Sequence, residues 1–142
     1  MGYRKNIDKV RELLDISDFS AARAWCEAHP ETANGYLFSK QCIIAYTMRR
    51  AAELAPQGIR MNCLSPAPTD TPMMDDFVAQ ISREFMDQHF QAPVGRNATA
   101  EEMAEPLIFL GSHAARFVSG VNLFVDFGYT AAVDAGLRPA LL

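Results

Sequence analysis

Residues 59–72 read IRMNCLSPAPTDTP, a short apolar-rich run that is followed at once by a proline-rich stretch. The run Ile59–Leu64 has the composition of a β-strand, and the pair Ser65-Pro66 ends it. Three prolines within residues 66–72 remove backbone donors, so this stretch is predicted to be irregular. A loop of restricted backbone at the end of a strand is the place where α/β sheets bind ligands.

A long helix precedes this strand. It is predicted from about Tyr36 to Leu54, because the stretch contains neither Gly nor Pro and the sequence Ala-Pro-Gln-Gly at 55–58 ends it. Apolar residues cover much of its circumference. We therefore expect this helix to be buried on more than one side, or to pack against another subunit.

Two shorter helices are predicted upstream of the long one. Apolar residues fall on one helical face over residues 7–14, and a second helix starts after a cap at Ser17 or Asp18 and ends at His29-Pro30. Residues 1–35 are therefore expected to be a helical insert.

Helices and a second strand follow the proline-rich loop. A helix is predicted over residues 75–90, a second one is capped by Thr99 and runs to about Leu110, and residues 121–125 form a strand. Alternating helices and strands indicate an α/β fold with a parallel sheet. Two strands cannot form a sheet that is covered on both faces, so we expect a piece of a larger domain.

Composition excludes several classes of protein. The 142 residues are 49% apolar and carry a formal net charge of -4, which suits one globular domain and not a nucleic-acid-binding protein. No run approaches the roughly 18 apolar residues of a membrane span, and no secretory signal is recognisable. The three cysteines form no CxxC pair and the three histidines lie far apart, so we expect no metal site and a cytoplasmic location.

One pair of residues carries a chemical signal by itself. Tyr36 and Lys40 are four residues apart at the start of the long helix, so they share one face. A phenol titrates near 10, but an adjacent ammonium favours the phenolate. Such a pair can pass a proton to or from an alcohol or carbonyl oxygen. A surface lysine beside a core tyrosine is the alternative interpretation.

Four motifs together resemble the C-terminal half of the short-chain dehydrogenase/reductase family. They are YLFSK at 36–40, the stretch 59–71 quoted above, EEMA at 101–104 and SGVNLFVD at 119–126. The first motif, the sequence SPAPTDTP and the preceding helical insert are most similar to the group of 3α-hydroxysteroid and coniferyl-alcohol dehydrogenases. The resemblance implies an incomplete Rossmann-like, doubly wound parallel sheet, with residues 36–128 as its C-terminal half and 129–142 as a tail.

The resemblance also implies roles for single residues. Tyr36 would be the general acid/base at the substrate oxygen, and Lys40 would hold the ribose hydroxyls of NAD or NADP. Thr69 would contact the nicotinamide carboxamide through its backbone, and Thr71 would approach the cofactor phosphates. For both threonines, turn or helix capping is the alternative.

Further residues complete the implied site. Pro66 and Ala67 would lie along the nicotinamide, although Ala67 stands where the family usually has Gly. Met73, Met74 and Phe77 would line the pocket for a bulky apolar alcohol or ketone, steroid-like or phenylpropanoid-like. Ordinary packing of an amphipathic helix is the alternative for these three.

Parts of the family pattern are missing from these 142 residues. No two glycines lie within four residues of each other, so there is no Gly-rich turn for the pyrophosphate. The catalytic serine is missing too, since Ser17 and Ser20 lie in the helical insert. We therefore expect a fragment, from a truncated gene or a misplaced start, that is inactive alone and binds no nicotinamide nucleotide.

Two other interpretations concern the class of function. The chain could be a non-catalytic oligomerisation or interaction fragment that uses helix 36–54, a helix through which we also expect a homodimer or homotetramer. A sugar-nucleotide epimerase or dehydratase shares the tyrosine–lysine pair, but the short distance from Lys40 to the second strand argues against it.

Overall fold

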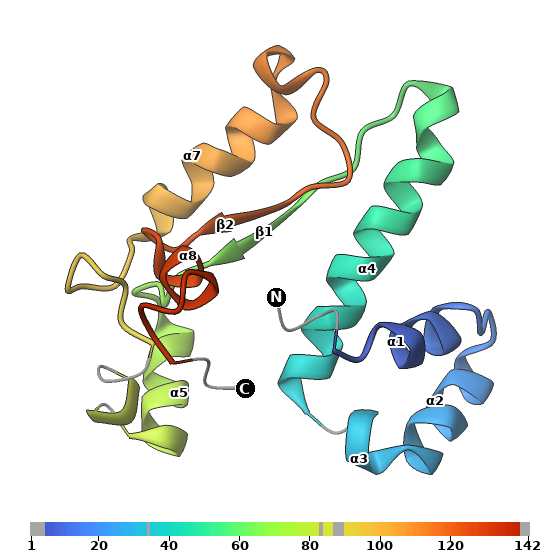
Figure 1. The fold of residues 1–142 in the computed structure, drawn as a ribbon, viewed down its shortest axis with the longest axis horizontal. Coiled ribbons are helices and arrows are strands. Elements are labelled where there is room, and N and C mark those ends of the chain that lie inside the picture. Colours follow the sequence, from blue (N-terminus) through green and yellow to red (C-terminus); the bar gives the residue numbers. More distant parts are fainter. Residues whose placement is uncertain (1–4, 34, 83, 87–89, 140–142) are drawn as a thin grey trace. The chain divides into compact units, whose positions relative to one another are not determined.

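The computed structural model describes residues 5–33, 35–82, 84–86 and 90–139 (Figure 1). The chain divides into two compact units. The first contains the residues up to Cys63 together with Ser119–Val121, and the second contains Leu64–Val118 and the residues from Asn122 onward. In chain order the helices are α1 (Ile7–Leu14), α2 (Phe19–Ala28), α3 (Pro30–Ala33), α4 (Tyr36–Leu54), α5 (Pro72–Ile81), α7 (Ala100–Gly111) and α8 (Tyr129–Asp134).

Two parallel strands, β1 (Cys63–Pro66) and β2 (Asn122–Val125), form one sheet. The Cys63 N–H donates to the Val121 carbonyl at 3.0 Å, and the Ala67 N–H donates to the Val125 carbonyl at 2.8 Å. Parallel strands need a crossover connection, which here contains α5 and α7. This arrangement confirms the predicted α/β class, a Rossmann-like parallel sheet of which two strands are described.

The first strand begins and ends later than predicted, since Ser65 and Pro66, which were expected to end it, are its last two residues. Residues 59–62 were expected to belong to it, but the ladder starts at Cys63. In the segment that precedes β2, Gly120 has φ of 76°. Next to it, the Asn62 side chain accepts from the Val121 N–H at 3.1 Å. The Met61 carbonyl still accepts from the Gly120 N–H at 2.8 Å, so backbone pairing continues beyond β1, but the Asn62 side-chain bond interrupts the regular ladder.

Helix α4 has the predicted bounds, and two of its faces are buried in the first unit. Phe38 and Ala45 belong to a core cluster with Val10 of α1. Thr47 lies nine residues, or about two and a half turns, after Phe38 and so occupies the opposite face. It is 2% exposed and hydrogen-bonds the Cys63 thiol. Packing within one chain therefore accounts for much of the apolar circumference.

Helices α1 to α3 form the predicted helical region ahead of α4. Val10 is fully buried, and the Trp25 ring stacks on that of Phe38 with centroids 6.2 Å apart. Asp18 caps α2 by accepting from the Ala21 N–H at 2.7 Å. Pro30 starts α3 rather than only ending α2, because its fixed φ suits the first position of a helix.

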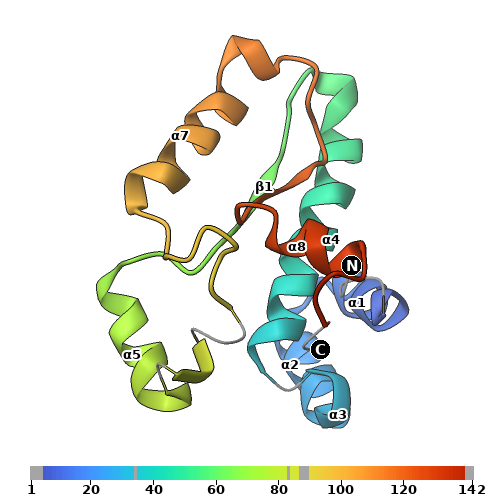
Figure 2. The same cartoon turned by 60° about the vertical axis from the view of Figure 1, so that its left-hand side comes forward.

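In the second unit, one helix ends earlier than predicted (Figure 2). A single helix was expected over residues 75–90, but α5 ends at Ile81 because Ser82 has φ of 82°, outside the helical region. Residues 83 and 87–89 of that prediction lie outside the described residues. Helix α7 starts after Thr99 as predicted.

Two features, a membrane-spanning helix and a metal-binding cluster, are absent from the described part of the chain. Among those residues, no helix is both long and apolar enough to cross a bilayer. The same residues contain no cluster of three or more histidine, cysteine, aspartate or glutamate side chains that could hold a metal ion.

Candidate functional site

Tyr36 and Lys40 lie together at the start of α4. Gly35 precedes the helix with φ of 103°, a backbone conformation that favours glycine. The Lys40 Nζ atom lies 4.8 Å from the centre of the Tyr36 ring, within the range of a cation–π contact. The Tyr36 side chain is 59% exposed, so the pair can be reached from outside the first unit.

The proline-rich loop belongs to the second unit. Pro66 is the last residue of β1, and Ala67 is buried in a small cluster with Ala92 and Ala98. The Thr69 hydroxyl donates to the Ala67 carbonyl at 2.9 Å, which is the turn-stabilising role that we considered as an alternative for this side chain. The hydroxyl proton of Thr69 is therefore already used within the loop.

A short parallel bridge fixes how the backbone of Thr69 is oriented. Thr69 is paired with Ala98: the Ala98 N–H donates to the Pro68 carbonyl, and the Asp70 N–H donates to the Ala98 carbonyl, both at 2.9 Å. In such a bridge the N–H and C=O of the middle residue point to the opposite side. The backbone of Thr69 thus presents one donor and one acceptor, which suits a primary amide.

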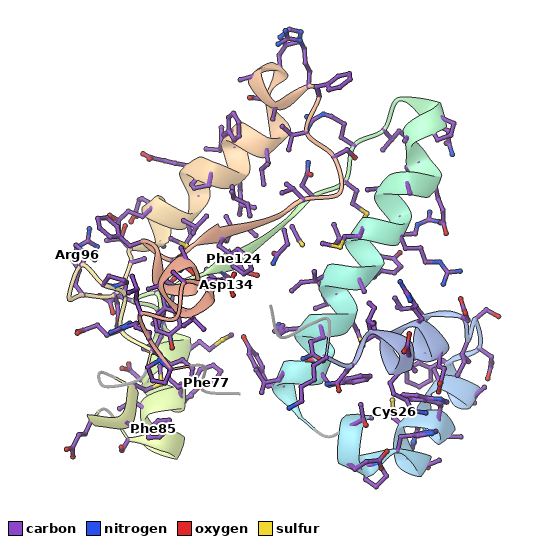
Figure 3. All side chains as sticks on the ribbon, in the orientation of Figure 1. Cys26, Phe77, Phe85, Arg96, Phe124 and Asp134 are labelled. Atoms are coloured by element: carbon purple, nitrogen blue, oxygen red, sulfur yellow. The ribbon has the colours of Figure 1, made fainter. Side chains whose placement is uncertain are left out.

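Thr71 and the predicted substrate residues lie around the start of α5. Thr71 is the extended N-cap residue, its hydroxyl makes no capping hydrogen bond, and its carbonyl accepts from the Met74 N–H at 2.8 Å. Met73 is 66% exposed, whereas Met74 and Phe77 are half-buried. Figure 3 labels Phe77 on α5. The first turn of α5 therefore offers an accessible apolar surface next to Thr71.

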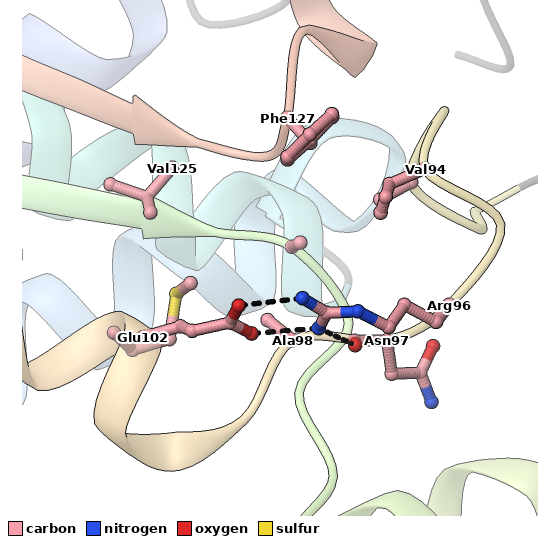
Figure 4. A pocket seen from close by; sticks show the side chains of 10 residues that line it. Val94, Arg96, Asn97, Ala98, Glu102, Val125 and Phe127 are labelled. Carbon is pink, nitrogen blue, oxygen red and sulfur yellow. Dashed lines mark hydrogen bonds and ion pairs between the residues drawn. The ribbon is translucent and has the colours of Figure 1, made fainter.

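Two small cavities flank the loop within the second unit. The first, of about 100 Å³, lies beside Ala67, Ala98, Met103 and Val125 (Figure 4). The second, of about 180 Å³, has the aromatic residues Phe90, Phe124 and Tyr129 in its wall together with Pro66, Ala67 and Pro68. Pockets for drug-sized ligands have roughly 300–1,000 Å³, so neither cavity alone holds a dinucleotide or a steroid.

An ion pair at the first cavity was not predicted from the sequence. The Arg96 guanidinium donates to both Glu102 carboxylate oxygens, at 2.6 and 2.8 Å. Arg96 beside Glu102, with a further hydrogen bond from the Thr99 N–H, lowers the pKa of that carboxyl to about 2. The only sequence signal was the spacing Thr99–Glu102 of a capping box, which identifies the glutamate but not its arginine partner.

The predicted site residues are thus divided between the two units. Tyr36 and Lys40 lie together in the first unit, and the remaining predicted residues lie along one continuous segment, 66–77, of the second.

Comparisons with known proteins bear on the family. A family model described as Enoyl-(Acyl carrier protein) reductase matches residues 13–130. The chain is 30% identical over 120 residues to a coniferyl-alcohol dehydrogenase of Pseudomonas sp. (strain HR199 / DSM 7063), covering 83% of this chain and 47% of that protein. It is 31% identical over 128 residues to a 3-alpha-hydroxysteroid dehydrogenase/carbonyl reductase of Comamonas testosteroni, covering 89% and 48%.

A solved structure agrees with these relatives. The structure of a 4-hydroxyisoleucine dehydrogenase mutant complexed with NADH and succinate superposes with a TM-score of 0.57 at 26% identity, covering 66% of this chain and 38% of that one. The chain spans about half the length of the curated relatives it matches. The predicted resemblance is confirmed, and the chain belongs to the short-chain dehydrogenase/reductase family.

Proposed function

We propose that this chain supplies the proton-transfer pair and the nicotinamide-facing loop of an NAD(P)-dependent alcohol dehydrogenase or carbonyl reductase. The observation that carries the proposal is the contact between the Lys40 ammonium and the Tyr36 ring, 4.8 Å from its centre, at an exposed position. The relatives named above are dehydrogenases and reductases, and a structural neighbour is complexed with NADH.

The proton is handled by groups of this chain. In reduction, Tyr36 donates the phenol proton to the oxygen that develops from the substrate carbonyl, and in oxidation it accepts the proton of the alcohol. The positive charge of Lys40 stabilises the phenolate that remains after donation. The nicotinamide, when bound, supplies or accepts the hydride.

The described residues fit one end of the cofactor. The backbone of Thr69 offers a donor and an acceptor to the carboxamide, and Pro66 and Ala67 restrict the loop that carries it. Lys40 is proposed to hold the ribose hydroxyls, and the exposed Thr71 to approach the phosphates. The sequence contains no Gly-rich turn for the pyrophosphate, so these 142 residues alone do not complete the nucleotide site.

The substrate is proposed to be a bulky apolar alcohol or ketone. Support comes from the first two turns of α5, where the exposed Met73 side chain and the half-buried Met74 and Phe77 offer a soft apolar surface. The matched relatives are named for coniferyl alcohol and 3α-hydroxysteroids, both of which are large and mostly apolar.

A chimeric protein tests this function. The coniferyl-alcohol dehydrogenase sequence that precedes its matched region is joined to residues 5–142 of this chain, and oxidation of coniferyl alcohol is followed with NAD or NADP. We expect turnover in the chimera, and Tyr36→Phe should lower kcat by about a hundredfold or more. Tyr46→Phe is the matched control, because Tyr46 is also exposed on α4.

Two checks make the result decisive. Circular dichroism and binding of NADH show whether each variant is folded and loaded. A folded chimera in which Tyr36→Phe and Tyr46→Phe retain equal turnover would remove Tyr36 from the mechanism.

A homo-oligomer through helix 36–54 remains our proposal for the partner. Two faces of α4 are buried within the first unit, while Ile43 and Tyr46 are 50% and 46% exposed on a third face. We expect sedimentation velocity to give one discrete oligomer that Ile43→Asp dissociates. The same measurement tests the non-catalytic alternative, which predicts the same oligomer together with an inactive chimera.

The cytoplasm remains the expected compartment, because the cysteines of the chain are free thiols.

A further inference from the structure

We propose that Arg96 and Glu102 are positioning residues of this enzyme, which hold the Pro66–Thr71 loop in the orientation that aims the Thr69 backbone at its ligand. The inference rests on the proposed function for its catalytic consequence. Neither residue is assigned a role by the predicted site. Arg96 lies two residues before Ala98, which is paired with Thr69 of the loop, and Glu102 lies in the first turn of α7 (Figure 4).

The ion pair has the geometry of a rigid clamp. Both carboxylate oxygens of Glu102 accept from the Arg96 guanidinium, so the two planar groups meet in a bidentate arrangement. Most exposed ion pairs contribute little, and these two side chains are 53% and 43% exposed. The ion pair by itself therefore contributes little stability, and its importance lies in the helix cap and the loop that it connects.

The carboxylate is also part of the N-terminal cap of α7. Glu102 accepts from the Thr99 N–H at 2.9 Å, and the Thr99 hydroxyl accepts from the Glu102 N–H at 3.3 Å, which is a capping box. Arg96 is thereby tied to the first turn of a twelve-residue helix. The helix fixes one end of the segment 96–99.

The other end of the segment is tied to the loop. The Arg96 guanidinium also donates to the Asn97 carbonyl at 2.9 Å, and the Asn97 side-chain amide donates to the Asp70 carboxylate at 2.8 Å. Asp70 follows Thr69 directly. One continuous chain of polar contacts thus runs from the helix cap to the residue next to Thr69.

The backbone pairing then sets the direction of Thr69. The Pro68 carbonyl and the Asp70 N–H are both used by Ala98, so the intervening backbone groups of Thr69 must face the other way. Prolines 66, 68 and 72 have no backbone N–H, which reduces the number of hydrogen bonds that can hold the loop. If the segment 96–99 shifts, the bridge opens and Thr69 loses its orientation.

Amide hydrogen exchange of the 142-residue chain tests the positional part. Glu102→Gln removes the charge, but Gln can still accept from Thr99 in a capping box. We expect the Asp70 and Ala98 amides to exchange about tenfold faster in this variant. The amides within α7, which lie outside the bridge, should keep their protection. Glu27→Gln is the control, because it removes the charge of an exposed ion pair on α2 at 2.8 Å from Arg23. Unchanged exchange at Asp70 and Ala98 would overturn the inference.

The chimera described above tests the catalytic consequence. A positioning role predicts that Glu102→Gln raises KM for the nucleotide by about tenfold with a smaller change in kcat, and that Arg96→Lys, which cannot form the bidentate pair, does the same. Faster exchange with unchanged KM would overturn positioning and leave a purely structural pair. An inactive parent chimera would overturn the proposed function, whereas the exchange experiment would still decide whether the pair holds the loop.

Discussion

At the scale of single residues, the Lys40 ammonium lies against the Tyr36 ring, and the Arg96 guanidinium is paired with the Glu102 carboxylate. Tyr36 and Lys40 are one helical turn apart, so their proximity followed once the helix was predicted. Arg96 meets Glu102 across the junction of a loop and a helix, where no repeat in the sequence relates the two. The roles of Thr69 likewise depend on a bridge to Ala98, 29 residues later in the chain (98 − 69).

The pH dependence of stability should report the Glu102 carboxylate. Arg96 and the Thr99 N–H hold its pKa at about 2, below the value of an unfolded glutamate near 4.3. A lowered folded-state pKa contributes stability that is fully present above the unfolded value and is lost as the pH falls toward 2. We expect the difference in Tm between the wild type and Glu102→Gln to be constant above about pH 5 and to shrink below it.

Exposure limits the size of this effect. Both side chains are about half-exposed, so added salt should reduce the difference in Tm. A difference in Tm that stays the same from pH 6 to pH 2 would show that the charge of Glu102 contributes nothing.

At the scale of elements, helices were predicted more accurately than strands. The bounds of α4 and the start of α7 follow from local signals, namely the absence of Gly and Pro and a threonine cap. The start of β1 depends on the segment just before β2, where Gly120 has a positive φ and which lies far along the chain from β1. The predicted helix 75–90 was wrong because nothing in the sequence indicates that Ser82 has a positive φ.

The packing of α4 on the upstream helices predicts a large effect of one substitution. Phe38 is 5% exposed, packs in the cluster with Val10 and stacks on Trp25. Phe38→Ala should lower the free energy of unfolding by about 3–5 kcal/mol, through lost burial and a cavity. Leu37→Ala on the same helix, at a residue that is 47% exposed, should cost clearly less.

Urea denaturation of the 142-residue chain measures both changes. Equal losses for the two variants would contradict the packing of α1 and α2 on α4, since only Phe38 contacts that cluster.

At the scale of the whole molecule, the chain carries part of a family pattern. It belongs to the short-chain dehydrogenase/reductases and spans about half the length of its curated relatives. The sequence contains the tyrosine–lysine pair and the proline-rich loop, but no Gly-rich turn. The presence of the tyrosine–lysine pair and the proline-rich loop, and the lack of a Gly-rich turn, could be predicted because each is a local sequence motif. The arrangement of the two units depends on long-range packing and could not be predicted.

The 142-residue chain is not expected to bind a nicotinamide nucleotide by itself. We expect isothermal titration of the 142-residue chain with NADH to give no binding at micromolar concentrations, because the pyrophosphate has no cradle of backbone N–H groups. The chimera, which supplies that cradle, is the positive control. Micromolar binding by the 142-residue chain alone would contradict this expectation.

Isotope transfer in the chimera tests the central claim most directly, namely that this chain completes a nicotinamide-dependent oxidoreductase through Tyr36. The aldehyde of coniferyl alcohol is incubated with NADH or NADPH that carries deuterium at both C4 positions, and the alcohol product is analysed by mass spectrometry. We predict one deuterium on the carbinol carbon with the parent chimera and with Tyr46→Phe, and at most about a hundredth of that yield with Tyr36→Phe. A folded, nucleotide-binding chimera that transfers no deuterium, or transfers it equally well without the Tyr36 hydroxyl, would contradict the account.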